Sequence, residues 1–222
     1  MELNAFYNNH KYECSKLHDV YINCIPDNGI CFDIGSNMGM YSESLLEKKN
    51  VFIHLFEPIK EYFNISVDKL RKYKDSVAIN NFGLSNISEQ KTIYMDCKNE
   101  TNNPGWNTYI DVGCISRMIP ETTTIITLDD YCTEHNISKI DFIKIDTEGY
   151  EAFVIDGFLK TLKNLTHKPY LYVEVAWGIN HPNWEFSKSV FEKLRTLGYD
   201  FPDLNNLTTT TDVLFTPIDR KK

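Results

Sequence analysis

Residues 31–41 restrict the fold of this chain more than any other segment. Residues 30–34 form an apolar run of strand length, and Gly35 and Gly39 follow before a segment of helical period begins. Glycine permits backbone conformations and close approaches that a Cβ would prevent. The segment therefore predicts a buried strand, a tight turn and a helix, which together form the first unit of a nucleotide-binding α/β domain.

The spacing within the turn distinguishes between nucleotide ligands. A dinucleotide fold uses G-x-G-x-x-G, whereas Asn37 occupies the position of the second glycine and the frame is D-x-G-x-x-x-G. This frame resembles the first motif of class I methyltransferases that use S-adenosylmethionine (SAM), in which the acid faces the ammonium of the methionine moiety. The resemblance implies a cofactor-binding set of Asp33, Gly35, Ser36, Asn37 and Gly39. The alternative is a structural turn without a ligand.

Two polar residues after the next predicted strands extend this site. Residues 51–56 predict a strand that ends at Glu57, roughly 20 residues beyond the glycine turn, where α/β nucleotide folds place an acid on the ribose hydroxyls. We expect Glu57 to accept hydrogen bonds from the ribose rather than to be an exposed loop acid. Residues 77–82 predict a third strand, and Asn81 at its end is either a partner for the adenine edge or an ordinary turn residue.

The α/β alternation is interrupted at about residues 91–128. Two predicted strands, 91–95 and 122–128, enclose a long polar loop that contains Trp106. We expect an antiparallel ribbon whose loop folds over the site, with Trp106 either stacking on a ligand or fixing its own loop. Residues 1–29 predict an N-terminal helical extension, which suits either a lid or a homodimer contact, and residues 30–222 form the main domain.

The most specific sequence motif lies at the end of the strand predicted at 140–146 and continues beyond it. Residues 144–151, K-I-D-T-E-G-Y-E, resemble the K-I-D-x-E-G-x-E signature of the FkbM family of methyltransferases. Other motifs of that family occur in the same order, and residues 32–41, 56–58, 127–131 and 173–175 resemble them. The resemblance implies a Rossmann-like class I methyltransferase fold, an α/β domain with a mixed seven-stranded sheet, helices on both faces and the inserted ribbon. It also implies SAM as methyl donor and O-methylation of a sugar, a glycan or a related small molecule.

Candidate catalytic residues also follow predicted strands. The carboxyl ends of parallel strands meet at one edge of a sheet, where α/β folds bind ligands. A sugar hydroxyl needs help to lose its proton, and the candidates for that base are Asp146 and His181, with Glu174 beside them. His181 is equally compatible with a packing role in its loop. Glu148 either holds the amino group of SAM or caps the helix that follows.

Several alternatives remain open at this point. Asp146 and Glu174 offer oxygen ligands that suit Mg²⁺, but no third ligand is evident, so we predict no metal. Lys144 with these two acids partly matches the Lys-Asp-Lys-Glu set of RNA ribose 2′-O-methyltransferases. A non-catalytic SAM-binding domain is a third hypothesis. We expect Glu151 and Asp156 to be solvated helix acids.

Composition limits the partners. The net charge is -8, with 31 acids against 23 bases, so a phosphate-binding surface and hence a nucleic-acid partner are disfavoured. The chain has no apolar run long enough to span a membrane, which predicts no membrane partner. The six cysteines form no C-x-x-C pair and the polar N-terminus lacks a secretion signal, so we expect reduced thiols and a cytoplasmic location.

Overall fold

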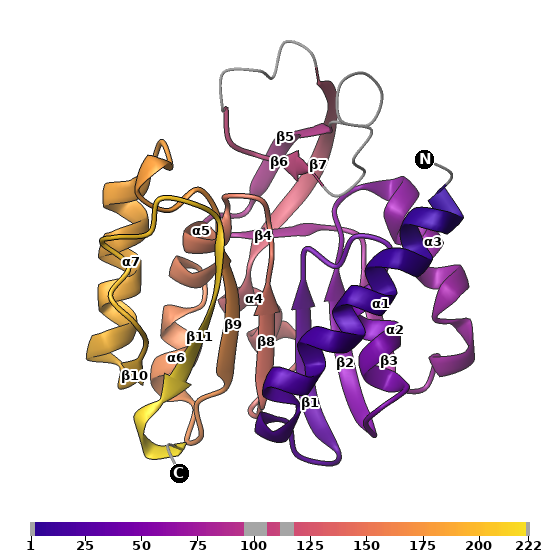
Figure 1. The fold of residues 1–222 in the computed structure, drawn as a ribbon, viewed down its shortest axis with the longest axis horizontal. Coiled ribbons are helices and arrows are strands. Elements are labelled where there is room, and N and C mark those ends of the chain that lie inside the picture. Colours follow the sequence, from indigo (N-terminus) through magenta and orange to yellow (C-terminus); the bar gives the residue numbers. More distant parts are fainter. Residues whose placement is uncertain (1–2, 96–105, 112–117, 221–222) are drawn as a thin grey trace.

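The main sheet has seven strands in the order β10-β11-β9-β8-β1-β2-β3 (Figure 1). The computed structural model describes residues 3–95, 106–111 and 118–220. The strands of this sheet are β1 (Gly29–Ile34), β2 (Val51–Phe56), β3 (Val77–Asn80), β8 (Phe142–Ile145), β9 (Tyr170–Val175), β10 (Tyr199–Asp200) and β11 (Thr211–Pro217). β11 runs antiparallel to β9 and pairs with β10, and the other five strands are parallel. The predicted mixed seven-stranded sheet is confirmed.

The register of the central strands places their ends side by side. Ile34, the last residue of β1, is aligned with Phe56 of β2 and with Ile145 of β8. The segments that leave these three strands therefore begin at one edge of the sheet, as the sequence predicted.

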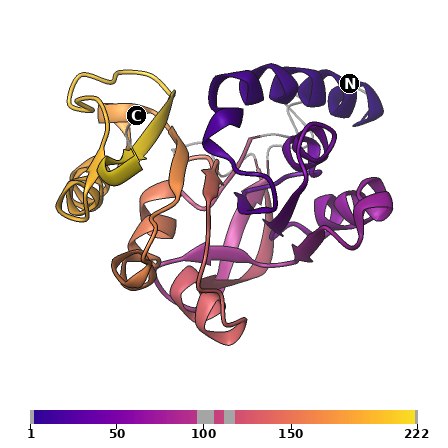
Figure 2. The ribbon, with the colours of Figure 1, turned by 90° about the horizontal axis from the view of Figure 1, so that it is seen from below.

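Helices cover both faces of the main sheet (Figure 2). They are α1 (Leu3–Tyr21), α2 (Met40–Leu46), α3 (Lys60–Lys69), α4 (Leu128–Glu134), α5 (Glu151–Asp156), α6 (Leu159–Asn164) and α7 (Trp184–Thr196), with short 3-10 turns at Ile22–Cys24, Arg71–Tyr73, Gly178–Asn180 and Ile218–Arg220. Alternate residues of β1 face opposite sides. Phe32 and Ile34 pack in the core under α4 to α7, whereas Cys31 packs with Tyr21 and Tyr41 of α1 and α2.

The prediction of an inserted antiparallel ribbon is wrong in one respect. The structure has a second sheet of four strands in the order β4-β7-β5-β6, beyond the carboxyl ends of the main strands (Figure 1). Its strands are β4 (Gly83–Ser85), β5 (Glu89–Met95), β6 (Asn107–Thr108) and β7 (Ile119–Thr127). β5 and β7 are antiparallel as predicted, but β4 pairs parallel to β7. The strand predicted at 77–82 therefore ends early, because the chain leaves the main sheet to reach the second one.

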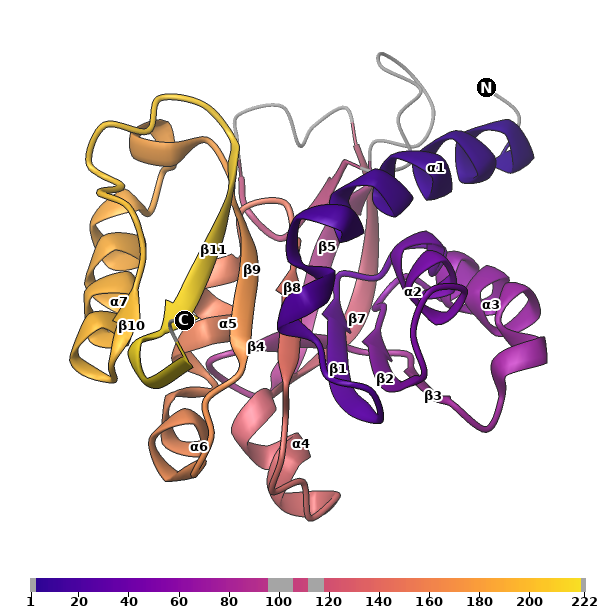
Figure 3. The same cartoon turned by 60° about the horizontal axis from the view of Figure 1, so that its bottom comes forward.

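The N-terminal extension contains one long helix, α1, which passes over β1 and beside α2 (Figure 3). The Tyr7 hydroxyl donates a hydrogen bond to the Glu43 carboxylate at 2.7 Å, and Lys11 Nζ lies 2.9 Å from the same carboxylate. At the other end of α1, the Tyr21 ring stacks on Phe142 with centroids 4.9 Å apart. The helix is thus fixed at both ends to the domain.

No described helix combines the length and the apolar character needed to cross a membrane. The cysteines that the structure describes, Cys14, Cys24, Cys31 and Cys132, are free thiols.

Candidate active site

A cavity of about 340 Å³ lies at the carboxyl edge of the central strands. Its volume is within the range of small-molecule sites. The predicted residues that line it are Gly35, Ser36 and Asn37 after β1, Glu57 after β2, Asp146 and Glu148 after β8, and Glu174 in β9. The structure therefore brings most of the predicted site residues into one place.

The glycine turn is required by the packing of the protein itself. Gly35 and Gly39 have φ values of +74° and +78°, a region that favours glycine. A Cβ on Gly35 would lie 1.8 Å from the backbone oxygen of Asp146. Gly35 is thus needed for the contact between the turns after β1 and β8, and Gly39 does not line the cavity. The side chain that the turn offers to a ligand is Ser36, whose buried Oγ has no hydrogen-bond partner among the described residues.

Glu57 is held by the backbone on the other side of the turn. The amide of Asn37 donates to one carboxylate oxygen and the amide of Ile59 donates to the other, both at 2.8 Å. Burial raises the pKa of the Glu57 carboxyl to about 8, although the two amide hydrogen bonds oppose this shift. A carboxylate oxygen has a second lone pair, so Glu57 can still accept from a ligand. The fixed carboxylate and the Ser36 hydroxyl fit the ribose and polar groups of SAM.

Besides Gly39, two predicted cofactor residues do not line the cavity, Asp33 and Asn81. Asp33 is fully buried on the α2 side of the sheet, where it accepts a hydrogen bond from Ser42 Oγ at 2.7 Å and lies 3.9 Å from Lys144 Nζ. This position does not fit direct contact with the SAM ammonium. The Asn81 amide donates to the backbone oxygens of Glu57 and Pro58, each at 3.0 Å. Asn81 therefore supports the Glu57 turn, and its contact with an adenine stays a prediction.

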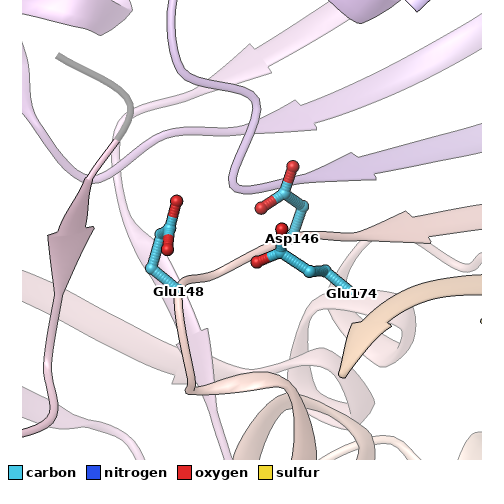
Figure 4. A group of neighbouring side chains, drawn as sticks. All are labelled: Asp146, Glu148 and Glu174. Atoms are coloured by element: carbon cyan, nitrogen blue, oxygen red, sulfur yellow. The ribbon is translucent and has the colours of Figure 1, made fainter. Parts of the chain in front are cut away.

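Three carboxylates converge at the ends of β8 and β9 (Figure 4). One oxygen from each of Asp146, Glu148 and Glu174 lies within 4.8 Å of the others. Burial raises the pKa of Glu148 to about 8 and that of Glu174 to about 10, and the charge of Asp146 adds to both shifts. The sequence identified two of these acids as a pair and left the third open. Carboxylates this close can share a proton or bind a cation.

Lys144 supplies the positive charge of this cluster. Its Nζ lies 2.9 Å from Asp146 Oδ2, and both residues line the cavity. Burial alone would lower the pKa of Lys144, but Asp146 and Asp33 outweigh burial and raise it. Lys144 is therefore a permanent cation that orients Asp146.

Glu151 is not a solvated helix acid, so that expectation is wrong. Its side chain is buried, and its Oε1 accepts hydrogen bonds from the Thr147 amide, the Thr147 hydroxyl and the Gly149 amide at 2.9–3.0 Å. These contacts hold the backbone on both sides of Glu148, which has a φ of +52°. Glu151, the second acid of the E-G-x-E motif, therefore shapes the loop that presents Glu148. The Glu148 side chain belongs to the carboxylate cluster (Figure 4).

His181 does not fit the role of a catalytic base. The Asn183 amide donates to Nδ1 at 2.9 Å, which places the ring proton on Nε2, and Nε2 donates to the Gly149 oxygen at 2.7 Å. Burial lowers the pKa of His181, and the ring does not line the cavity. Because both nitrogens are occupied, His181 supports the Gly149 backbone, together with the stacked ring of Trp177.

The T-L-D-D words also have a structural role. The Thr127 hydroxyl accepts from the Asp130 amide at 3.0 Å and caps α4. Asp129 accepts from the Thr161 amide at 2.7 Å in the first turn of α6. These residues fix two helices behind the sheet and do not reach the cavity.

Sequence reasoning missed several lining residues. From the second sheet these are Asn107 and Tyr109; from α1 they are Phe6, His10, Glu13 and Cys14; and from β9 and β11 they are Tyr172 and Asp212. Thr108 also contacts the loop of the site, because its hydroxyl donates to the backbone oxygen of Glu148 at 2.6 Å. Trp106, the residue singled out in this insertion, is half-buried and does not line the cavity. None of the missed residues belongs to a recognisable sequence motif. Their positions at the cavity depend on how the second sheet and α1 pack against the main sheet.

The strand order and the ligand-sized cavity at the carboxyl edge define the class as an α/β methyltransferase of class I. The family described as "Methyltransferase FkbM domain" matches residues 33–201, and the chain belongs to this family. The expected SAM cofactor follows from this membership.

Solved structures show the same fold at low sequence identity. One is a protein assigned as an rRNA methylase from Clostridium thermocellum, with a TM-score of 0.52, 12% identity and coverage of 90% of this chain and 93% of that one. Another is a methyltransferase-like protein from Streptococcus mutans in complex with SAH, with a TM-score of 0.52, 12% identity and coverage of 89% and 93%. The O-methyltransferase TomG from Streptomyces achromogenes, in complex with SAM, has a TM-score of 0.52, 9% identity and coverage of 92% and 79%. No curated protein matches the chain.

Proposed function

We propose that this protein transfers the methyl group of SAM to a hydroxyl group of a sugar, a glycan or a related small molecule. The observation that carries the proposal is the shared cavity, which is lined both by Glu57 and Ser36 and by the Lys144–Asp146 pair. The first pair would hold the cofactor and the second pair would hold the acceptor hydroxyl.

Each residue has a defined task in this proposal. SAM supplies a methyl group that is already activated by its sulfonium. Asp146, oriented by Lys144, accepts the hydrogen bond of the acceptor hydroxyl and takes its proton. Glu174 shares that proton within the carboxylate cluster. Alignment of the hydroxyl with the methyl group supplies much of the rate.

RNA ribose methylation is the weaker alternative. The structure does bring Lys144, Asp146 and Glu174 together, which matches three members of the Lys-Asp-Lys-Glu set. Among the described residues, however, no second lysine lines the cavity. The acidic lining also opposes a phosphate backbone. The rRNA methylase assignment of one structural neighbour at 12% identity shows a shared fold alone.

The Asp146→Asn substitution tests the proposal. Methyl transfer from labelled SAM to a panel of sugars and glycans should fall by about 100-fold or more, because the proton acceptor is lost. SAM binding should stay within about twofold of the unmodified protein, as should that of the exposed-site control Asp68→Asn. Full turnover in Asp146→Asn would contradict the assigned role, and the absence of turnover with every acceptor in the unmodified protein would favour a non-catalytic domain. The cytoplasmic location and the homodimer contact stay predictions.

A further inference from the structure

The cavity extends beyond the part of the chain that the family match covers. That match spans residues 33–201, whereas α1 and β11 lie outside it. Phe6, His10, Glu13 and Cys14 of α1 and Asp212 of β11 nevertheless line the cavity, beside Glu174 of β9. We call these six residues the acceptor half, and we call Gly35, Ser36, Asn37 and Glu57 the cofactor half.

The α1 wall is held firmly enough to define a binding surface. Besides the contacts of Tyr7 and Lys11 with Glu43, the Tyr21 ring lies against Tyr172 of β9 with centroids 4.6 Å apart. Cys14 lies near enough to the charged cluster for Lys144 and Asp33 to affect its pKa, which burial raises to about 11. The helix therefore lies close to the strand ends across the cavity.

Carboxylates dominate the acceptor half. Glu174 and Asp212 are direct partners in the antiparallel pair of β9 and β11. Burial raises the pKa of both carboxyl groups, so each would be stabilised in its charged form by a positive charge placed against it. Glu13 of this half is paired with Lys16, and the Asp212 side chain has a hydrogen bond with Tyr172. Among the described residues, Glu174 has no ion-pair partner. The lysine that lines the cavity, Lys144, is already paired with Asp146.

One of these carboxylates lacks a partner inside the cavity wall. Glu174 Oε2 is buried and has no hydrogen-bond partner among the described residues. A buried acceptor without a donor costs roughly 1–3 kcal/mol. Two opposed acids and one unfilled acceptor in a ligand-sized cavity call for a ligand that brings donors and positive charge. An ammonium group brings three donors and one positive charge.

We propose that the acceptor half binds a hydroxyl compound that carries a protonated amine, as an amino sugar does, with the ammonium against Glu174 and Asp212. This inference rests on the proposed function and specifies its substrate class. The same lining disfavours phosphorylated and nucleotide-linked acceptors, because their phosphates would meet carboxylates. Among the described residues that line the cavity, one is a lysine, and it is already paired with Asp146.

Three probes that share one ring test the proposal. Glucosamine, glucose and glucose 6-phosphate are titrated by calorimetry into the full-length protein loaded with SAH, at a pH where the amine is protonated. We expect glucosamine to bind at least about tenfold more tightly than either glucose or glucose 6-phosphate, a difference of about 1.4 kcal/mol. Equal or tighter binding of glucose 6-phosphate would overturn the inference, and so would the absence of glucosamine binding.

A pair of double variants assigns the preference to the proposed residues. Glu174→Gln/Asp212→Asn should remove the preference for glucosamine over glucose. The control Asp68→Asn/Glu192→Gln, at two exposed sites that form local ion pairs, should retain it. An unchanged preference in the first variant would overturn the assignment.

Two further titrations distinguish this inference from the proposed function and from metal binding. SAM is titrated first into the same protein: if SAM fails to bind, the proposed function fails, whereas bound SAM with a reversed probe order overturns the charge inference alone. A titration with MgCl₂ is run in parallel. Saturable Mg²⁺ binding that blocks glucosamine would show that the carboxylates serve a metal and would overturn the amine assignment.

Discussion

Glu57 and Glu174 both lie near the carboxyl end of a strand and line the same cavity, yet the protein treats them differently. Both oxygens of Glu57 accept backbone amide hydrogen bonds, whereas one oxygen of Glu174 is buried without a partner. Glu57 is therefore held in place by the fold itself, whereas Glu174 keeps an acceptor that the fold does not fill. The comparison indicates that Glu57 is positioned before a ligand binds, whereas Glu174 retains an oxygen that can accept from a ligand.

The largest effect is expected where the cofactor half depends on close backbone packing. Gly35→Ala should lower the free energy of unfolding by about 3 kcal/mol, because the new Cβ would overlap the Asp146 oxygen at 1.8 Å and the residue has a positive φ. Urea unfolding measures the loss.

Gly198→Ala is the matched control for that variant. Gly198 also has a positive φ, of +87°, but a Cβ there would meet no atom within 4 Å. Its loss should be limited to the backbone cost of about 1 kcal/mol. Equal losses in the two variants would show that the turn is not packed as described.

The next largest effect is expected in the loop at residues 147–149, which Glu151 holds in place. Glu151→Ala removes the acceptor of three hydrogen bonds and should cost about 2 kcal/mol. Glu151→Gln should retain most of the stability, because all three donors bond to Oε1, which an amide oxygen can replace. If glutamine were as harmful as alanine in urea unfolding, the negative charge rather than the hydrogen bonds would hold the loop.

In the acceptor half, we expect a substitution to stabilise the protein rather than destabilise it. The pKa of Glu174 is raised to about 10, by burial first and then by Asp146, Glu148 and Glu151, while Lys144 opposes the shift. A raised pKa contributes stability that is complete below the unfolded value of about 4.5 and is lost as the pH rises toward 10. Glu174→Gln should therefore become increasingly stable relative to the unmodified protein between pH 5 and pH 9.

Urea unfolding at pH 5, 7 and 9 measures this difference. The exposed-site variant Glu192→Gln should show no trend over the same interval. A flat difference for Glu174→Gln would mean that Glu174 is not held in an unfavourable site, and the comparison between the two halves would lose its basis.

The smallest effect should come from the α1 anchor. Tyr7→Phe removes one hydrogen bond to Glu43 and should cost about 1 kcal/mol. Hydrogen exchange should increase in α1 while SAM binding stays constant, because α1 belongs to the acceptor half. The exposed-site variant Tyr12→Phe should change neither quantity. Weaker SAM binding in Tyr7→Phe would show that α1 also supports the cofactor half.

Local patterns predicted the part of the structure that depends on neighbours in the chain. The strand, turn and helix of residues 31–41, the acid at Glu57 and the loop at 144–151 are each contained in one short segment, and all lie at the predicted edge of the sheet. Parallel strands impose this arrangement, so a correct order of elements was enough to gather the site.

The remaining features depend on contacts between distant segments. The parallel pairing of β4 with β7 and the reach of α1 across the cavity leave no periodic trace in the sequence. Likewise, a histidine in a loop and a glutamate in a first helical turn look alike whether they face solvent or the backbone. The roles of His181 and Glu151 were therefore settled by their hydrogen-bond partners.

Calorimetric titration of SAM into the purified protein tests the central claim most directly. Glu57→Ala and the exposed-site control Glu61→Gln are titrated alongside, and NAD⁺ serves as the competing nucleotide. We predict saturable SAM binding that weakens by at least about tenfold in Glu57→Ala, is unchanged in Glu61→Gln, and has no NAD⁺ counterpart. Absent SAM binding, or equal SAM binding in the unmodified protein and Glu57→Ala, would contradict the assignment of the cofactor half.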